Sequence, residues 1–337
     1  MAKTNIEEPK PYVVGIDVGG TNSVIGIVDA RGNILRSSSI KTATHLDIED
    51  FVADLAAEIK KIADSEKVWD KIHGIGIGAP NGNYFTGSID FAPNLPWKGR
   101  IPLAHLLSEA TGLPVALTND ANAAAIGEMT YGAARGMKDF IEITLGTGVG
   151  SGIVVGGKLV YGHDGFAGEI GHTIIRRNGR ICGCGRQGCV ETYCSATGVA
   201  RTAKEYLEIR EDASLLREVP IDEITSKDVY DAAMKGDKLA IEIFESAGTI
   251  LGEALADAVA YTSPEAIVLF GGLTRAGDFI IEPTKKAMEK NLLNIYKGKV
   301  KILVSELSES DAAVLGASAM GWEADRTHLV KLVKSDE

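Results

Sequence analysis

Apolar runs flank a glycine-rich turn in two separate stretches of the chain. Residues 12–28 consist of an apolar run, the turn Asp17-Val18-Gly19-Gly20-Thr21-Asn22 and a second apolar run, which predicts two strands followed by a hairpin turn at residues 29–33. Residues 140–155 repeat this order around a second turn at residues 145–152, with another hairpin turn at residues 156–158. Because the repeat is about one domain long rather than the roughly 20–50 residues of a solenoid unit, it predicts two domains of related topology that face each other.

Other stretches have the periodicity of helices or of buried strands. Residues 47–64 place Phe51, Leu55, Ile59 and Ile62 on one helical face. Further helical patterns cover residues 198–210, 226–235, 237–260 and 312–324. Short apolar runs predict buried strands at residues 73–78, 115–118 and 266–270, and the Pro, Gly and Asn content of residues 80–102 predicts an irregular loop. Strands alternate with helices, which indicates an α/β fold.

Composition narrows the class of protein. The chain has 337 residues, of which 45% are hydrophobic and 24% charged, so it is long enough for two folded domains and does not resemble a disordered chain. A net charge of −11 disfavours nucleic acid and anionic membrane surfaces as partners. The first ten residues are polar and contain no apolar signal-peptide segment. We therefore expect a cytoplasmic protein that binds a small molecule.

The first glycine turn has the chemistry of a phosphate-binding loop. Gly19 and Gly20 allow backbone N–H groups to approach phosphate oxygens closely, and Thr21 and Asn22 add donors. An aspartate would repel a bare phosphate, so Asp17 makes most sense as an organiser of Mg²⁺. A single turn of this kind is equally compatible with an ordinary hairpin, but its recurrence favours phosphate binding. Neither turn fits the dinucleotide fingerprint or the P-loop.

The four cysteines of the chain fall within residues 182–194, next to a histidine. His172, Cys182, Cys184 and Cys189 have the spacing H-x9-C-x-C-x4-C, and three cysteines with one histidine form a common structural zinc site. A disulfide is a poor alternative, because Cys182 and Cys184 are too close in sequence for an easy bridge. Four protein ligands leave no open position for water, so this zinc would be structural. Cys194 lies outside the pattern and is expected to be buried.

Four sequence blocks together resemble the ROK family of sugar kinases and repressors. They are Asp17-Val18-Gly19-Gly20-Thr21, the turn at residues 146–150, Gly168-Glu169-Ile170-Gly171-His172, and residues 182–191 from Cys182 to Glu191. The resemblance runs from about Tyr12 to Trp322 and implies a two-domain actin/hexokinase-like (ribonuclease H-like) fold, with ATP and sugar in the interdomain cleft. We expect one domain of residues 1–118 plus 311–337 and a larger one of residues 119–310.

The resemblance also implies roles for individual residues. Asp120 resembles the catalytic base, although Asn119 or Asp120 before an apolar run is also typical of a helix N-cap. The expected sugar contacts are Asn94, Asn119, Asp120, Glu169, His172 and Glu191. Taken singly, the two glutamates are also compatible with solvated surface charges, and Asn94 with a turn former. The expected phosphate and nucleotide contacts are Asp17, Gly19, Gly20, Thr21, Asn22, Gly146, Thr147, Gly148 and the adenosine-side turn Gly271-Gly272.

These inferences favour an ATP-dependent hexose kinase, most simply a glucokinase that phosphorylates the 6-hydroxyl of D-glucose. Residues 93–97 and 78–82 resemble the glucokinase branch, although Asn81 replaces a glycine of the commoner G-x-P-G form. The alternatives are a kinase for N-acetylmannosamine, N-acetylglucosamine, allose or fructose, and a sugar-sensing repressor. Only sixteen residues precede Asp17, which disfavours the helix-turn-helix domain that such repressors add. ATP, Mg²⁺ and structural Zn²⁺ are the expected cofactors, and a dimer or tetramer is the expected assembly.

Overall fold

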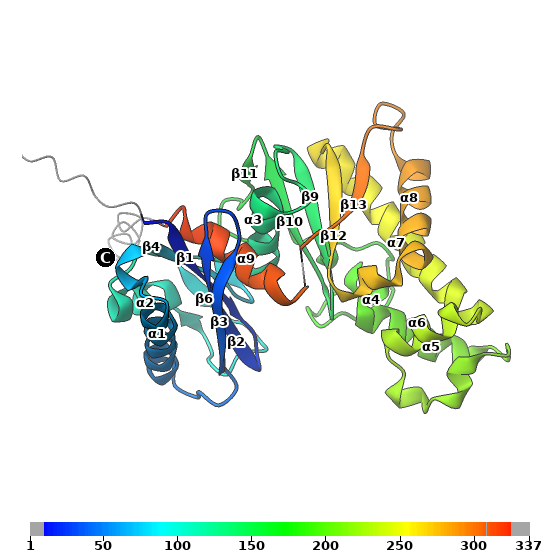
Figure 1. Cartoon of the computed structure of the whole chain (residues 1–337). Coiled ribbons are helices and arrows are strands. Elements are labelled where there is room, and N and C mark those ends of the chain that lie inside the picture. Colours follow the sequence, from blue (N-terminus) through cyan, green and yellow to red (C-terminus); the bar gives the residue numbers. More distant parts are fainter. Residues whose placement is uncertain (1–9, 308, 325–337) are drawn as a thin grey trace, which may run out of the picture. The chain divides into compact units, whose positions relative to one another are not determined.

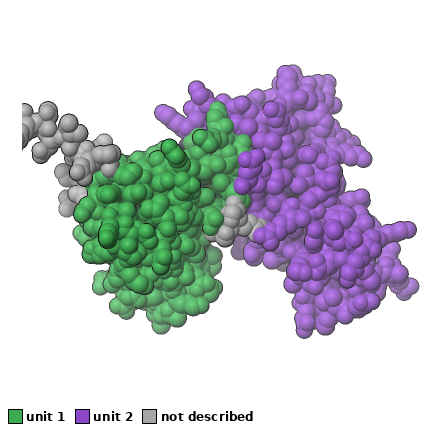
Figure 2. All heavy atoms as spheres, viewed as in Figure 1, with its two compact units in different colours: residues 1–136, 161–167, 307–337 green, residues 137–160, 168–306 purple. Residues whose placement is uncertain are grey.

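The computed structural model describes residues 10–307 and 309–324, which divide into two compact units (Figures 1 and 2). Unit 1 takes in the chain up to residue 136, residues 161–167 and the chain from residue 307, and unit 2 takes in residues 137–160 and 168–306. The division differs from the expected domains because it assigns residues 119–136 and 161–167 to unit 1 and begins the last part of that unit at residue 307 rather than 311. The expected absence of a signal peptide concerns residues 1–10, of which residues 1–9 lie outside the described part.

Unit 1 is built on a five-stranded sheet of order β3-β2-β1-β4-β8. Its strands are β1 (Tyr12–Val18), β2 (Asn22–Asp29), β3 (Ile34–Lys41), β4 (Ile72–Gly78) and β8 (Val115–Thr118). β1, β2 and β3 are antiparallel neighbours, whereas β4 and β8 run parallel to β1. The predicted glycine turn connects β1 to β2, and the predicted hairpin turn connects β2 to β3.

Helices cover both faces of this sheet. α1 (Ile48–Ser65) begins at the N-cap Asp47, whose side chain accepts from Glu49 N at 2.7 Å, and it buries the predicted apolar face against the sheet together with α2 (Leu103–Thr111). α3 (Asp120–Tyr131) and α9 (Glu309–Gly321) pack against each other and against β4. A Cβ at Gly15 or Gly76 would lie 2.1 Å or 1.9 Å from a carbonyl oxygen of α9. Glycine at these positions therefore lets α9 lie directly on the sheet.

The expected irregular loop at residues 80–102 contains a small three-stranded sheet, which corrects that prediction. Its strands are β5 (Gly82–Asn83), β6 (Ser88–Asp90) and β7 (Arg100–Ile101). Strands of two or three residues have too few positions to show alternation, so the turn-forming residues dominate the sequence pattern. A buried hydrogen bond from Ser88 to Asp90 and a salt bridge from Arg100 to Asp90 add side-chain support to this sheet.

Unit 2 repeats the arrangement of unit 1. Its sheet has the order β11-β10-β9-β12-β13, made of β9 (Phe140–Leu145), β10 (Val149–Val155), β11 (Lys158–Leu159), β12 (Ala266–Phe270) and β13 (Lys301–Val304). β9, β10 and β11 are antiparallel neighbours, and β12 and β13 are parallel to β9. The two sheets thus have the same strand order and directions, which confirms the repeat predicted from the two glycine turns.

The helices of unit 2 form a core against this sheet that includes Phe244, Leu251 and Leu255. They are α4 (Glu191–Cys194), α5 (Ala196–Ile209), α6 (Ser226–Met234), α7 (Lys238–Thr262) and α8 (Asp278–Asn291). Short 3₁₀ helices occur at Trp69–Lys71, Ile170–His172, Leu215–Glu218, Ile221–Glu223 and Gly272–Ala276. No helix within residues 10–307 and 309–324 is long and apolar enough to span a membrane.

Candidate active site

The parallel strands of unit 1 bring two aspartates together. Asp17 on β1 is in register with Gly78 on β4, and Gly78 is in register with Thr118 on β8, two residues before Asp120. Burial and the neighbouring charge of Asp120 raise the pKa of Asp17 to about 6. The Asp120 side chain reaches solvent, yet the surrounding protein desolvates it enough to raise its pKa as well. Two carboxylates within electrostatic reach of each other suit a site that binds a cation and moves a proton.

At the start of α3, the sequence left open which of two adjacent residues is the N-cap and which is free to act as a base. Asn119 is the N-cap, because its side-chain oxygen accepts from Asn122 N at 2.6 Å. Asp120 is the first helical residue, and its carboxylate accepts from its neighbour Ala121 N at 2.8 Å. The cap therefore does not depend on the Asp120 carboxylate, whose other oxygen lone pairs stay available to a ligand.

The first glycine turn packs closely against the segment that carries Asn94. A Cβ at Gly20 would lie 2.6 Å from the Asn94 carbonyl oxygen, so glycine is required for this approach. In the same segment, Trp97 is buried, packs against Phe51 with the two rings tilted and their centroids 4.6 Å apart, and donates from Nε1 to the His45 carbonyl oxygen. Asn94 itself is exposed beside the turn. The structure thus brings Asn94 and the first glycine turn together in unit 1.

Asn81, which departs from the glucokinase-like pattern, fits its position. Its backbone φ is 52°, in the left-handed region where glycine is common and asparagine is the best tolerated substitute. Its side-chain amide also donates to the Asp90 carbonyl oxygen at 3.0 Å. The asparagine therefore preserves the turn that the usual glycine would make.

The second glycine turn of the chain, at residues 145–152 in unit 2, is held by three sets of hydrogen bonds. Gly146 N donates to the Gly148 carbonyl oxygen at 3.0 Å, and the carbonyl oxygens of Gly146 and Thr147 accept from α5. Val149 N donates to the Glu191 carboxylate at 3.1 Å. Among the described residues, the backbone N–H groups of Thr147 and Gly148 have no protein acceptor. These two consecutive donors have the character of an anion-binding nest.

The expected adenosine-side turn, Gly271-Gly272, lies against the end of β9. β12 ends at Phe270, opposite Thr144 of β9, and Gly271 follows with a φ of 100°. A Cβ at Gly271 would lie 2.6 Å from the Leu145 carbonyl oxygen. Both the backbone angle and the close approach require glycine here, and they place this turn next to the strand that leads into the second glycine turn.

The four residues of the predicted zinc motif come together in unit 2. One ligand atom from each of His172, Cys182, Cys184 and Cys189 lies within 4.8 Å of all the others. Cys182 Sγ lies 3.6 Å from His172 Nδ1, and Cys184 Sγ lies 3.7 Å from Cys189 Sγ. Tetrahedral zinc with typical bond lengths would separate a sulfur from a nitrogen by about 3.6 Å and two sulfurs by about 3.8 Å. The donor set and its spacing therefore fit a structural zinc ion.

The three residues of unit 2 that are expected to contact the sugar lie within or beside this motif: they are Glu169, His172 and Glu191. Glu169 immediately precedes the 3₁₀ turn that contains His172, and its carbonyl oxygen accepts from His172 N at 3.1 Å. Glu191 Oε1 lies 3.5 Å from Cys182 Sγ, while Glu191 Oε2 holds the second glycine turn through Val149 N. Glu169 is exposed and Glu191 is half-buried. Glu191 thus links the cysteine cluster to the second glycine turn.

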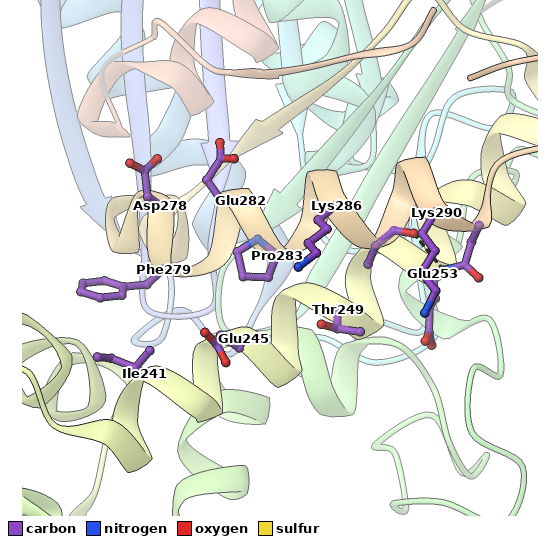
Figure 3. Close-up of a pocket in the computed structure, with 12 residues that line it drawn as sticks. Ile241, Glu245, Thr249, Glu253, Asp278, Phe279, Glu282, Pro283, Lys286 and Lys290 are labelled. Carbon is purple, nitrogen blue, oxygen red and sulfur yellow. Dashed lines mark hydrogen bonds between the residues drawn. The ribbon is translucent and has the colours of Figure 1, made fainter. Parts of the chain in front are cut away.

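Two hollows in unit 2 contain residues that the sequence patterns did not single out. One of about 480 Å³ lies beside Thr147 and is lined by Thr197, Arg201 and Lys204 of α5 and by the start of α6. The other, of about 550 Å³, lies between α7 and α8, where Figure 3 shows Glu245 and Glu253 on one side and Glu282 and Lys286 on the other. The first adjoins the candidate phosphate turn, and none of the described residues that line the second is a predicted site residue. Ser195 is the N-cap of α5, a pattern that the sequence could have revealed, and the first two residues of that helix, Ala196 and Thr197, line the first hollow.

Two equivalent sheets, each with a glycine turn after its first strand, define the class of this protein. They constitute the actin/hexokinase-like fold. Comparison with known proteins agrees: residues 13–323 match the ROK family. The chain belongs to the ROK family.

Three relatives illustrate this membership. The chain is 38% identical to a glucokinase of Halalkalibacterium halodurans, over 92% of this chain and 94% of that protein. It is 33% identical to a glucokinase of Thermotoga maritima, over 93% of this chain and 98% of that protein. A crystal structure of a ROK family glucokinase from Streptomyces griseus in complex with glucose and AMPPNP is similar with a TM-score of 0.77 and 33% identity, over 93% of this chain and all of that chain.

Proposed function

We propose that this protein is an ATP-dependent glucokinase that transfers the γ-phosphoryl group of ATP to the 6-hydroxyl of D-glucose. The observation that carries the proposal is the pair of equivalent sheets with glycine turns. The sheet of unit 1 brings Asp120 beside Asp17. Similarity to glucokinases over more than nine-tenths of the chain supports it independently.

In this proposal Asp120 is the general base. The glucose 6-oxygen forms a bond to the γ-phosphorus as the bond from that phosphorus to the oxygen bridging to the β-phosphate breaks, and ADP leaves. The hydroxyl proton passes to the Asp120 carboxylate. Desolvation raises the pKa of Asp120, which makes its ionised form a stronger base.

The two glycine turns would hold the phosphates of ATP. In unit 1, Gly19 and Gly20 with Thr21 and Asn22 offer backbone and side-chain donors at the end of β1. In unit 2, the N–H groups of Thr147 and Gly148 serve the same purpose, and Gly271-Gly272 is proposed to border the adenosine. Mg²⁺ would neutralise phosphate charge when bound, and the Asp17 carboxylate at the first turn is the group that would hold it.

The sugar hydroxyls would be bound by Asn94 and Asn119 of unit 1 and by Glu169, His172 and Glu191 of unit 2. Each carboxylate can accept bonds from two hydroxyls, which suits a polyol. We further propose that His172, Cys182, Cys184 and Cys189 hold a structural zinc ion. When bound, it would fix the backbone that carries Glu169 and Glu191, and it would take no part in phosphoryl transfer. The dimeric or tetrameric assembly and the cytoplasmic location stay predictions.

The test is ADP release by the purified full chain with ATP, Mg²⁺ and a panel of sugars. We expect glucose to give the highest kcat/KM among glucose, fructose, allose, N-acetylglucosamine and N-acetylmannosamine. A strong preference for another sugar would overturn the glucose assignment alone. No release above background with any of them would overturn the kinase assignment.

Asp120→Asn identifies the base in the same assay. It removes the base but keeps the Asn119 cap, so we expect kcat to fall by ~10²–10⁴-fold while glucose affinity, measured by calorimetry, changes much less. Asp278→Asn is the matched control, since Asp278 is the first residue of α8 as Asp120 is of α3, and it should leave kcat unchanged. Near-normal turnover by Asp120→Asn would remove Asp120 from the chemistry.

A further inference from the structure

The orientation of the second glycine turn is set by the start of α5. Ala196 N donates to the Gly146 carbonyl oxygen at 2.9 Å, and the Thr197 hydroxyl donates to the Thr147 carbonyl oxygen at 2.7 Å. A trans peptide is planar, with its C=O and N–H pointing in opposite directions. The Gly146 carbonyl shares a peptide with Thr147 N–H, and the Thr147 carbonyl shares one with Gly148 N–H. Fixing these two carbonyls toward α5 therefore turns both N–H groups away from it.

A directional chain of hydrogen bonds stands behind the Thr197 hydroxyl. Gly198 N donates to Ser195 Oγ at 3.0 Å, and Ser195 Oγ lies 2.9 Å from Thr197 Oγ1. The single hydroxyl proton of Thr197 is already donated to Thr147, so Ser195 must be the donor to Thr197. Successive bonds of this kind polarise one another, and a carbonyl that accepts a hydrogen bond makes the N–H of its own peptide a better donor.

The peptides held in this way are the ones with free donors. The N–H groups of Thr147 and Gly148 have no protein acceptor among the described residues, and they point away from α5. An anion with several oxygens is the ligand that these groups would recognise.

We propose that Thr197 is a positioning residue for the phosphoryl donor, acting by fixing and polarising the Thr147-Gly148 peptide. The proposal rests on the proposed kinase function and deepens it, because it assigns a role in binding the phosphoryl donor ATP to a side chain that lies outside both glycine turns. Its signature is selective: loss of the hydroxyl impairs use of ATP and spares glucose.

Thr197→Val removes the hydroxyl and keeps the shape of the side chain. Since a misplacement of about 1 Å can cost ~10²-fold in rate, we expect kcat/KM for ATP to fall by ~10–100-fold, with KM for glucose within about twofold of wild type. Thr197→Ser restores the hydroxyl and should recover most of the loss. Thr284→Val is the matched control, because Thr284 on α8 also donates to a carbonyl oxygen at 2.7 Å, and it should leave ATP kinetics unchanged. Equal kinetics for Thr197→Val and Thr284→Val, or failure of serine to rescue, would overturn the proposal.

Ser195→Ala separates positioning from direct contact. Ser195 is fully buried and has no access to the nucleotide, yet it supports Thr197. We expect a smaller loss in the same direction, roughly 2–5-fold in kcat/KM for ATP, as for a network partner one bond removed. Unchanged ATP kinetics in a folded Ser195→Ala, beside a defective Thr197→Val, would mean that Thr197 touches ATP directly and would overturn the positioning role.

Two binding and spectroscopic measurements keep this inference distinct from the kinase assignment. In Thr197→Val, the amide ¹⁵N resonance of Gly148 should shift, because its peptide loses the bond to the Thr147 carbonyl, and calorimetry should show weaker binding of ADP. Both readouts hold even if wild type phosphorylates none of the sugars, in which case the kinase assignment alone fails. An unshifted Gly148 resonance with unchanged ADP affinity would overturn the role of Thr197 itself.

Discussion

At the scale of single residues, the candidate site depends on neighbours with different duties. Asn119 caps α3, and Asp120, one residue later, carries a desolvated carboxylate. Spacing along the chain cannot separate these roles, because either residue type is a good cap. The observed hydrogen bond from Asn122 N to Asn119 decides the question in favour of Asn119 as the cap. Asp120 is thereby left without a structural duty that would explain a desolvated carboxylate.

Asp17→Asn should raise stability at neutral pH. Burial and the Asp120 charge raise the pKa of Asp17 from 3.8 to about 6, so the folded chain binds this proton more tightly than the unfolded chain does. Stability therefore increases as pH falls from about 6 towards 4, and above pH 6 the charge costs about 1–3 kcal/mol. We expect Asp17→Asn to gain about that much free energy of unfolding at pH 8, with the gain vanishing near pH 4. Urea titrations without Mg²⁺ or nucleotide at several pH values measure it.

Asp29→Asn is the control with the opposite sign. Burial is the largest single influence and raises the pKa of Asp29, but hydrogen bonds from the side chain and backbone of Asn33 and from the backbone of Arg31 together outweigh it and lower the pKa. Its charge therefore stabilises the fold above its usual pKa, and Asp29→Asn should lose stability at pH 8. A loss of stability for Asp17→Asn at pH 8 would show that the Asp17 charge is not destabilising.

At the scale of elements, the segment from His172 to Glu191 has few regular contacts to hold it. It contains a 3₁₀ turn, two isolated β-bridges and backbone bonds such as Cys182 N to the Arg186 carbonyl oxygen at 2.9 Å. Arg180 anchors it to α4 and α5 through Thr192 and Thr202. A short segment with so little buried apolar surface is the kind that a metal ion stabilises.

Cys182→Ser should remove zinc and weaken sugar binding while leaving the fold intact. Cys182 touches both His172 and Glu191, so loss of the metal loosens the backbone that carries two proposed sugar contacts. Elemental analysis, glucose Kd and far-UV circular dichroism measure the three effects. Cys194→Ser is the matched control, since Cys194 is buried, donates to the Ala247 carbonyl oxygen and lies outside the cluster, and it should keep both zinc and sugar affinity.

The zinc proposal has two outcomes that would contradict it. Wild type purified without chelators and found free of zinc would remove the metal. Cys182→Ser that loses zinc yet binds glucose as tightly as wild type would keep the metal but break its link to the sugar site.

At the scale of the whole molecule, the chain passes between its two units four times, since residues 161–167 and the chain from residue 307 belong with the first. The proposed reaction draws groups from both units onto the same two substrates. Closing a site of this kind excludes water, which would otherwise accept the phosphoryl group.

Glucose should therefore reduce the radius of gyration of the protein. We expect small-angle scattering to show a more compact particle with saturating glucose, and more so when a nonhydrolysable ATP analogue is added. A sugar that is neither bound nor phosphorylated serves as the control. An unchanged radius with both ligands bound, as verified by calorimetry, would mean that binding involves no closure.

The sequence by itself determined the local and repetitive features of this protein. Glycine turns between apolar runs predicted the paired hairpins, the spacing of Phe51, Leu55 and Ile59 predicted α1, and the cysteine motif predicted a cluster that the structure brings together. These signals are readable because each depends on residues that are close in sequence. α8 and β13 have no counterpart among the predicted elements, and Pro283 inside α8 obscures its pattern.

Only the tertiary structure decided how distant residues meet. The pairing of β1, β4 and β8 brings Asp17 to Asp120 and raises its pKa, and the start of α5 fixes the peptides of Thr147 and Gly148. The packing of α3 on α9 likewise assigned residues 119–136 to unit 1. Desolvation, charge coupling and peptide orientation arise from contacts across tens of residues, and no local pattern along the chain records them.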